Sequence, residues 1–116
     1  MIVGIGLDGI ELGRIQKAVL RRKRFVDRIL TRAEKEQYET LSESRKIEFL
    51  AGRFAAKEAY AKARGTGIGK LSWQDIEVKT DNGRPVIIAT DMRQEKVHMT
   101  ITHTKAFAAA QVIITK

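Results

Sequence analysis

The segment between Ser42 and Gly65 constrains the fold of this chain more than any other stretch of the sequence. At about 100° per residue, its apolar side chains fall on two opposite sides of a helix. A helix that is apolar on two sides needs neighbours on both, so this one should be central. We predict that Ser42 or Ser44 caps its first turn and that Gly65 follows its last residue.

Glu58 is the residue that least suits this helix. It falls inside an apolar stripe formed by Ile47, Leu50, Ala51, Phe54 and Ala61. A carboxylate directed at a core is costly unless a positive charge meets it. One interpretation is an i,i+4 ion pair with Lys62 on a partly wetted helix. The other is a role in holding a hard metal ion or in transferring a proton, and it requires a second carboxylate.

The N-terminal residues form a predicted strand that supplies this carboxylate. Residues 2–8 alternate in character. One face is apolar and is expected to point into the core: Val3, Ile5 and Leu7. The other face carries only Gly4 and Gly6 before Asp8. A face without side chains is expected where another backbone or a ligand comes close.

Asp8 and Glu58 together indicate a magnesium site. Each is a carboxylate on an otherwise bare or apolar surface, and Mg²⁺ binds a few carboxylates together with water and substrate phosphates. Nearby cations are then expected to hold a phosphate-rich substrate: Arg53, Lys57 and Lys62.

Most of the net charge of +8 comes from residues 14–32, which contain eight lysines and arginines and one aspartate. Such a compact basic face predicts an anionic partner, whether nucleic acid, a membrane surface or an acidic protein. Arg14, Arg21 and Arg28 recur at intervals of seven residues, so they lie near one line beside Phe25 if the segment is helical. Arginines around an apolar residue suit docking to an acidic amphipathic helix.

The chain has no cysteine, which excludes disulfides, zinc–thiolate sites and thiol nucleophiles. This composition fits a reducing compartment. No apolar run approaches the roughly 20 residues of a membrane span, and the first residues are interpreted as a strand rather than a signal peptide. We therefore expect a cytoplasmic protein without a membrane partner.

The other predicted elements complete a fold of one strand, three helices and four strands. The first helix starts at about Ile10, and a capping box of Thr31 with Glu34 opens the second. Four strands follow, the first two joined by a turn at residues 81–83: residues 73–79, 85–89, 97–102 and 107–114. This order predicts a single α+β domain over residues 1–116, with a mostly antiparallel sheet packed on the long helix.

His103 lies at the end of one of these strands. His98 points to the opposite face, so the two histidines do not form a metal pair. A histidine in this position is usually structural, but beside Thr104 and Lys105 it is also a candidate for binding phosphate.

Two motifs resemble the signatures of a known family, the phosphopantetheinyl transferases. The first resembles the N-terminal signature, with the pattern G-I-G-L-D-x-x-E-L-x-R-I over residues 4–15. The second resembles the helical signature, with F-A-A-K-E-A-Y-x-K over residues 54–62 and G-T-G-I-G after it. The whole chain is similar to the short bacterial holo-[acyl-carrier-protein] synthases of that family, and the resemblance implies their fold.

The resemblance implies transfer of 4′-phosphopantetheine from coenzyme A to a serine of apo acyl carrier protein. This reaction releases adenosine 3′,5′-bisphosphate and supports fatty acid biosynthesis. Carried onto this sequence, it implies that Asp8 and Glu58 bind Mg²⁺ with the pyrophosphate of coenzyme A, and that Lys62 contacts the leaving phosphate. The catalytic base remains open between Glu58 and a metal-bound water oriented by Asp8 or Glu11.

The same resemblance implies further binding residues and a homotrimer with sites between subunits. It implies contacts to the 3′-phosphate of coenzyme A from Arg45, Arg53, His103 and Thr104. Near the adenosine it places the Gly65 and Thr66 turn and the hairpin from Asn82 to Pro85. The acidic carrier protein would dock on four arginines, with Phe25 as the apolar anchor: Arg14, Arg21, Arg24 and Arg28.

Two other functions fit part of the pattern. A small basic nucleic-acid-binding domain would explain the charge, but the chain has only seven aromatic residues and no aromatic pair alternating on a strand to stack bases. A non-catalytic module that binds proteins through its arginines would also explain the charge. Neither explains Asp8 and Glu58, so the transferase, without a nucleic-acid partner, is the predicted function.

Overall fold

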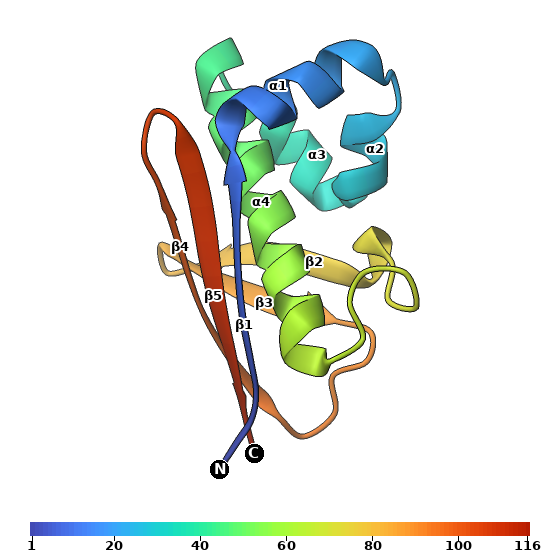
Figure 1. Cartoon of the computed structure of the whole chain (residues 1–116), viewed down its shortest axis with the longest axis vertical. Helices are drawn as coiled ribbons and strands as arrows, with labels where there is room; N and C mark the ends of the chain where they lie inside the picture. The colour runs from blue at the N-terminus through green and yellow to red at the C-terminus, as the bar shows by residue number, and fades with distance from the viewer.

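The long helix predicted from the sequence is α4, Glu43–Arg64, and it passes through the middle of the computed structural model (Figure 1). The structure describes residues 1–116. Before α4 come four elements: β1 (Ile2–Glu11), α1 (Leu12–Arg21), α2 (Phe25–Ile29) and α3 (Arg32–Glu39). After it come a short 3₁₀ helix and four strands: η1 (Trp73–Asp75), β2 (Ile76–Asp81), β3 (Arg84–Ala89), β4 (Lys96–His103) and β5 (Phe107–Thr115).

The predicted ends of α4 are confirmed. Ser42 is the N-cap residue, although its side chain makes no capping hydrogen bond. Gly65 follows the last turn with a left-handed φ of 80°, and its N–H donates to the carbonyls of Ala61 and Lys62. Glycine adopts this conformation without the penalty that a Cβ would bring, so the helix ends here.

α4 is shared by two apolar clusters, as a helix with two apolar sides requires. Its first half packs among the three short helices, with a core that includes Ile15, Ile29, Leu30, Tyr38, Leu50 and Ala51. Its second half packs against the strands, with a core that includes Ala55, Ala59, Tyr60, Ile76, Val78, Val112 and Ile114. The helix therefore connects a helical part of the molecule to a sheet part.

The strands form two antiparallel sheets. One has the order β1-β5-β4, and β2 and β3 form a separate hairpin. The predicted α+β fold with mostly antiparallel strands packed on the long helix is confirmed, with the strands divided between two sheets. The hairpin turns at Asn82 and Gly83, whose φ values of 51° and 77° are the left-handed values that a tight hairpin turn needs.

The glycine face of β1 lies directly on α4. A Cβ added to Gly4 would lie 2.0 Å from the carbonyl oxygen of Ala63, and one added to Gly6 would lie 1.8 Å from that of Ala59. The predicted close approach of another backbone is confirmed, and no side chain would fit at either position. This contact places Asp8, two residues further along the same face, beside the helix.

The prediction that the apolar face of β1 points into the core of the chain is wrong. Val3, Ile5 and Leu7 were expected to face the core, but they are 46%, 58% and 62% exposed. The reason is that the strand packs on α4 through its glycine face, which directs the apolar face outward.

Three local boundaries also differ from the predictions. β1 continues to Glu11, so the first helix starts at Leu12 rather than near Ile10. The residues at 73–75 form the 3₁₀ helix rather than the start of a strand. The basic segment is not one helix, because α1 ends at Arg21 and α2 begins at Phe25.

None of the helices combines the length and the apolar character needed to cross a lipid bilayer.

Candidate active site

The two predicted carboxylates come together where β1 crosses α4. Asp8 is half-buried opposite Ala110 in the strand register. Its Oδ1 accepts a hydrogen bond from Lys62 Nζ at 3.0 Å, and the same ammonium group donates to the carbonyl oxygen of Leu7 at 3.1 Å. Lys62 therefore pairs with Asp8, and the i,i+4 ion pair with Glu58 that one interpretation expected is not the pair that forms.

Glu58 lies within the electrostatic field of this pair. Burial raises the pKa of Glu58, the negative charge of Asp8 raises it further, and the positive charge of Lys62 opposes both effects. Unlike Asp8, the Glu58 side chain has no hydrogen-bonding partner in the structure, although it is half-buried. The two carboxylates thus repel each other across a site that one lysine only partly neutralises.

This arrangement suits a divalent cation. A hard dication would remove the repulsion between the carboxylates, and Mg²⁺ is commonly bound by one or two carboxylates with water and substrate phosphates. No group of three or more acidic, histidine or cysteine side chains gathers elsewhere in the chain to form a closed metal cage. Asp8 and Glu58 therefore fit Mg²⁺ only as an open site that substrate oxygens complete.

Lys57 does not belong to this site, and its predicted role as a phosphate-binding cation is wrong. Its side chain is fully buried, and its Nζ donates to Glu34 Oε1 at 2.7 Å. The same group donates to the carbonyl oxygens of Ile29 at 2.7 Å and Trp73 at 3.1 Å. Neighbouring helical residues point about 100° apart, so Lys57 enters the interior while Glu58 faces the site.

The sequence did not predict that Glu34, the partner of Lys57, is buried in the interior. The sequence predicted Glu34 as part of the capping box at Thr31, and both bonds of that box are present. In addition to the capping bonds, Glu34 Oε1 accepts a hydrogen bond from Lys57 Nζ, and Glu34 Oε2 accepts one from the N–H of Val78 at 2.7 Å. Burial lowers the pKa of Lys57, and the charge of Glu34 opposes that effect. A capping motif gives no sequence signal for this second contact.

Arg53 is another cation on α4, partly buried, and one of its donors has no hydrogen-bond partner. Its guanidinium group lies 3.9 Å from the ring centroid of Phe49, and its Nε is buried without a hydrogen-bond partner. Burial lowers the pKa of Arg53, and the charge of Glu34 works in the opposite direction. An unpaired buried donor is costly, so Arg53 is suited to receive an anionic oxygen from a ligand.

The other residues predicted to bind coenzyme A do not come together within one chain. Arg45 and the Gly65 turn lie near opposite ends of α4, about 30 Å apart at 1.5 Å per residue. His103 and Thr104 lie at the β4–β5 turn beside the start of α4 (Figure 1), where His103 Nδ1 is 3.9 Å from Glu48 Oε2. Asn82 and Pro85 lie on the β2–β3 hairpin.

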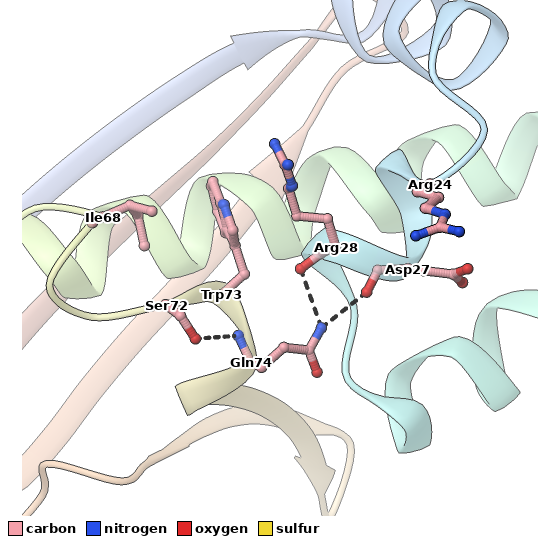
Figure 2. A pocket seen from close by; sticks show the side chains of 8 residues that line it. Arg24, Asp27, Arg28, Ile68, Ser72, Trp73 and Gln74 are labelled. Carbon is pink, nitrogen blue, oxygen red and sulfur yellow. Dashed lines mark hydrogen bonds between the residues drawn. The ribbon is translucent and has the colours of Figure 1, made fainter.

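The predicted docking arginines line two hollows, one between α1 and α4 and the other between α2 and η1. One hollow of about 340 Å³ is lined by Arg14, Arg21, Phe25, Phe54 and neighbouring residues of α1. A second, of about 610 Å³, is lined by Arg24, Asp27, Arg28, Ile68, Gly69, Ser72, Trp73 and Gln74 (Figure 2).

Phe25 does not project from this surface as the predicted anchor. It is only 9% exposed, and its ring centroid lies 6.3 Å from that of Phe54. Phe54 in turn stacks on Trp73 with centroids 4.9 Å apart. Phe25 and Phe54 line the hollow beside α1, and Trp73 lines the hollow beside α2. Phe25 therefore forms part of the wall of a hollow instead of inserting into a partner.

A pair of acidic side chains with one lysine lies next to an arginine-lined surface, and this arrangement is chemically suited to a phosphate-rich substrate. The model of the 4′-phosphopantetheinyl transferase superfamily matches residues 4–115. A holo-[acyl-carrier-protein] synthase of Bacillus subtilis is 64% identical over 116 residues, which cover 98% of this chain and 96% of that protein. A holo-[acyl-carrier-protein] synthase of Shouchella clausii is 57% identical, with 98% of each chain covered.

Solved structures agree with the sequence comparison. A holo-(acyl-carrier-protein) synthase from Bacillus anthracis, in complex with CoA (3′,5′-ADP), matches with a TM-score of 0.92 and 52% identity over 100% of this chain and 98% of that chain. The Helicobacter pylori synthase in complex with coenzyme A matches with a TM-score of 0.83 and 32% identity, covering 96% and 99% of the two chains. The chain belongs to the 4′-phosphopantetheinyl transferase superfamily.

Proposed function

We propose that this chain transfers 4′-phosphopantetheine from coenzyme A to a serine hydroxyl of apo acyl carrier protein and releases adenosine 3′,5′-bisphosphate. The observation that carries the proposal is the meeting of Asp8, Glu58 and Lys62 at the crossing of β1 and α4. Full-length relatives named holo-[acyl-carrier-protein] synthase support it, as does the related structure in complex with CoA (3′,5′-ADP).

In this proposal, Asp8 and Glu58 would hold Mg²⁺ beside the pyrophosphate of coenzyme A. The ion, when bound, supplies positive charge where negative charge builds up during phosphoryl transfer. Lys62 leaves Asp8 and holds an oxygen of the leaving phosphate, which stabilises the same charge. The serine proton is taken either by Glu58 or by a water molecule oriented by Asp8 or Glu11.

The site is proposed to lie between subunits of a homotrimer. The outward apolar face of β1 supports this arrangement, because Val3, Ile5 and Leu7 form a row of exposed apolar side chains that another subunit would cover. The separation of the predicted coenzyme A residues supports it as well. Arg45, Arg53, His103 and Thr104 would bind the 3′-phosphate of a coenzyme A whose pyrophosphate lies at Asp8 and Glu58 of a neighbour.

The carrier protein is proposed to dock on the arginine surface. Arg14 and Arg21 on α1, Arg24 at the N-cap of α2 and Arg28 on α2 are exposed, and the acidic partner would neutralise them. The lack of cysteine fits a reducing compartment, so the cytoplasm remains the predicted location.

The decisive experiment is mass spectrometry of an apo acyl carrier protein after incubation with this chain, coenzyme A and Mg²⁺. We expect the carrier protein to gain the mass of one phosphopantetheine group, and to gain none when a chelator removes divalent ions. An unchanged mass with every apo carrier protein tested would contradict the transferase and favour a binding module.

A further inference from the structure

The C-terminal end of α2 is held by side chains from outside the helix. Four successive carbonyl groups at this end accept hydrogen bonds from two residues. The two N–H groups of Gln74 Nε2 are shared among three of them: Asp27 at 2.9 Å, Arg28 at 3.1 Å and Leu30 at 2.9 Å. Lys57 Nζ donates to the remaining one, that of Ile29, at 2.7 Å. Figure 2 shows the Gln74 amide between the carbonyls of Asp27 and Arg28.

These contacts matter because α2 is only five residues long. The last four carbonyls of a helix lack partners within it, and a helix this short is not stable by itself. Donors at the C-terminus also interact favourably with the helix dipole. The orientation of α2 therefore depends on Lys57 and Gln74 far more than that of a long helix would.

Both donors are themselves fixed to the rest of the molecule. Lys57 is fully buried on α4, one residue before Glu58, and is paired with Glu34. Gln74 belongs to η1, where its N–H donates to Ser72 Oγ at 3.2 Å, and the neighbouring Trp73 ring stacks on Phe54 of α4. The helix that carries the catalytic carboxylate is thus connected directly to the end of α2.

The residues that α2 presents are Arg24, just before its first turn, and Arg28, on its last turn. Both line the same hollow as Gln74 and Trp73 (Figure 2). A rotation of α2 would move these arginines relative to Asp8 and Glu58. A partner docked on them would then present its reactive group at a different distance from the site.

We propose that Lys57 and Gln74 are positioning residues, which set the orientation of α2 so that an acidic partner docked on Arg24 and Arg28 presents its hydroxyl to Asp8 and Glu58. This inference rests on the proposed transfer to a carrier protein. It assigns to Lys57 a role toward the protein substrate and none toward coenzyme A.

The test uses Gln74→Met in the full chain, because Gln74 is exposed and its replacement should not prevent folding. Loss of these hydrogen bonds should raise the KM for apo carrier protein about fivefold and leave the KM for coenzyme A unchanged. Amide exchange at Arg28 and Leu30, whose N–H groups donate to the carbonyls of Arg24 and Val26 at the two ends of α2, should become faster. Gln37→Met is the matched control, since Gln37 is also exposed and its side chain has no hydrogen bond in the structure.

Lys57→Met tests the second donor, but it leaves Glu34 unpaired and is expected to lower stability. Gln74→Met is therefore the variant that decides the test. A fall in kcat with both KM values unchanged would indicate only a loss of folded enzyme and would overturn the proposal. Faster exchange in α2 with an unchanged KM for the carrier protein would also overturn it. If the unaltered chain transfers nothing, or if Arg28→Glu leaves carrier binding intact, it is the proposed function or docking surface that fails.

Discussion

Lys57 and Glu58 are adjacent in the sequence, yet their surroundings are opposite. Lys57 is fully buried, and three acceptors meet its ammonium group. Glu58 is half-buried, has no hydrogen-bond partner, and faces a second carboxylate across the site. An ionised side chain with hydrogen-bond partners holds elements of the fold together, whereas one without partners is available to a ligand. The comparison therefore separates a structural charge, Lys57, from a charge proposed to be catalytic, Glu58, on the same helix.

The largest expected effect comes from removing the unsatisfied charges. Asp8→Asn or Glu58→Gln should lower the rate of transfer at least about a hundredfold, comparable with the loss of one group that stabilises developing charge. The measurement is initial rate with saturating coenzyme A and Mg²⁺, with circular dichroism as the check of the fold. Glu36→Gln, on the exposed face of α3, is the control and should transfer at the normal rate. Normal turnover in either site variant would refute the metal assignment.

Removing the satisfied charge should affect stability most. Lys57→Met leaves the buried Glu34 carboxylate without its cation and should lower the free energy of unfolding by about 3–5 kcal/mol. Lys62→Met breaks the half-exposed pair with Asp8 and should change it by less than about 1 kcal/mol. Urea denaturation of the two variants measures both changes. An equal loss of unfolding free energy in the two variants would contradict the expectation that the buried Lys57–Glu34 pair contributes more than the half-exposed Lys62–Asp8 pair.

A substitution on the proposed docking surface should change binding of the carrier protein rather than the rate of transfer or the stability of the fold. Arg21→Glu places a negative charge where an acidic partner is proposed to bind, and should weaken carrier-protein binding about tenfold without changing coenzyme A binding. Titration calorimetry with each ligand measures this difference. Arg32→Glu is the control within the same basic segment, because Arg32 lies on α3 and is almost fully exposed. Equal losses for both ligands would assign Arg21 to the nucleotide site.

The features that could be predicted from the sequence are those that periodicity and local motifs specify. The ends of α4, the capping box at Thr31 and the close approach at Gly4 and Gly6 follow from local chemistry, and all three are confirmed. The direction of Lys57 could not be predicted, because it depends on a glutamate 23 residues away that the sequence marks only as a cap. The exposed face of β1 was misjudged because an alternating pattern does not say which face the helix covers.

The smallest expected effect is the stability cost of Glu58 itself. Because the pKa of Glu58 is raised above 4.5, the folded chain binds more protons at this site than the unfolded chain does between pH 4.5 and the raised value. The free energy of unfolding therefore falls as the pH rises through this range, and the cost persists at neutral pH.

Glu58→Gln removes that cost, so without metal it should raise the Tm at neutral pH and make a smaller difference at about pH 4, where the unfolded carboxyl is mostly protonated. Thermal melts at the two pH values measure the change. Added Mg²⁺ should raise the Tm of the unaltered chain more than that of the variant, because a ligand that binds only the folded site stabilises it. A lower Tm for Glu58→Gln at neutral pH would show that Glu58 has a partner in the fold and would place it with Lys57 among the structural charges.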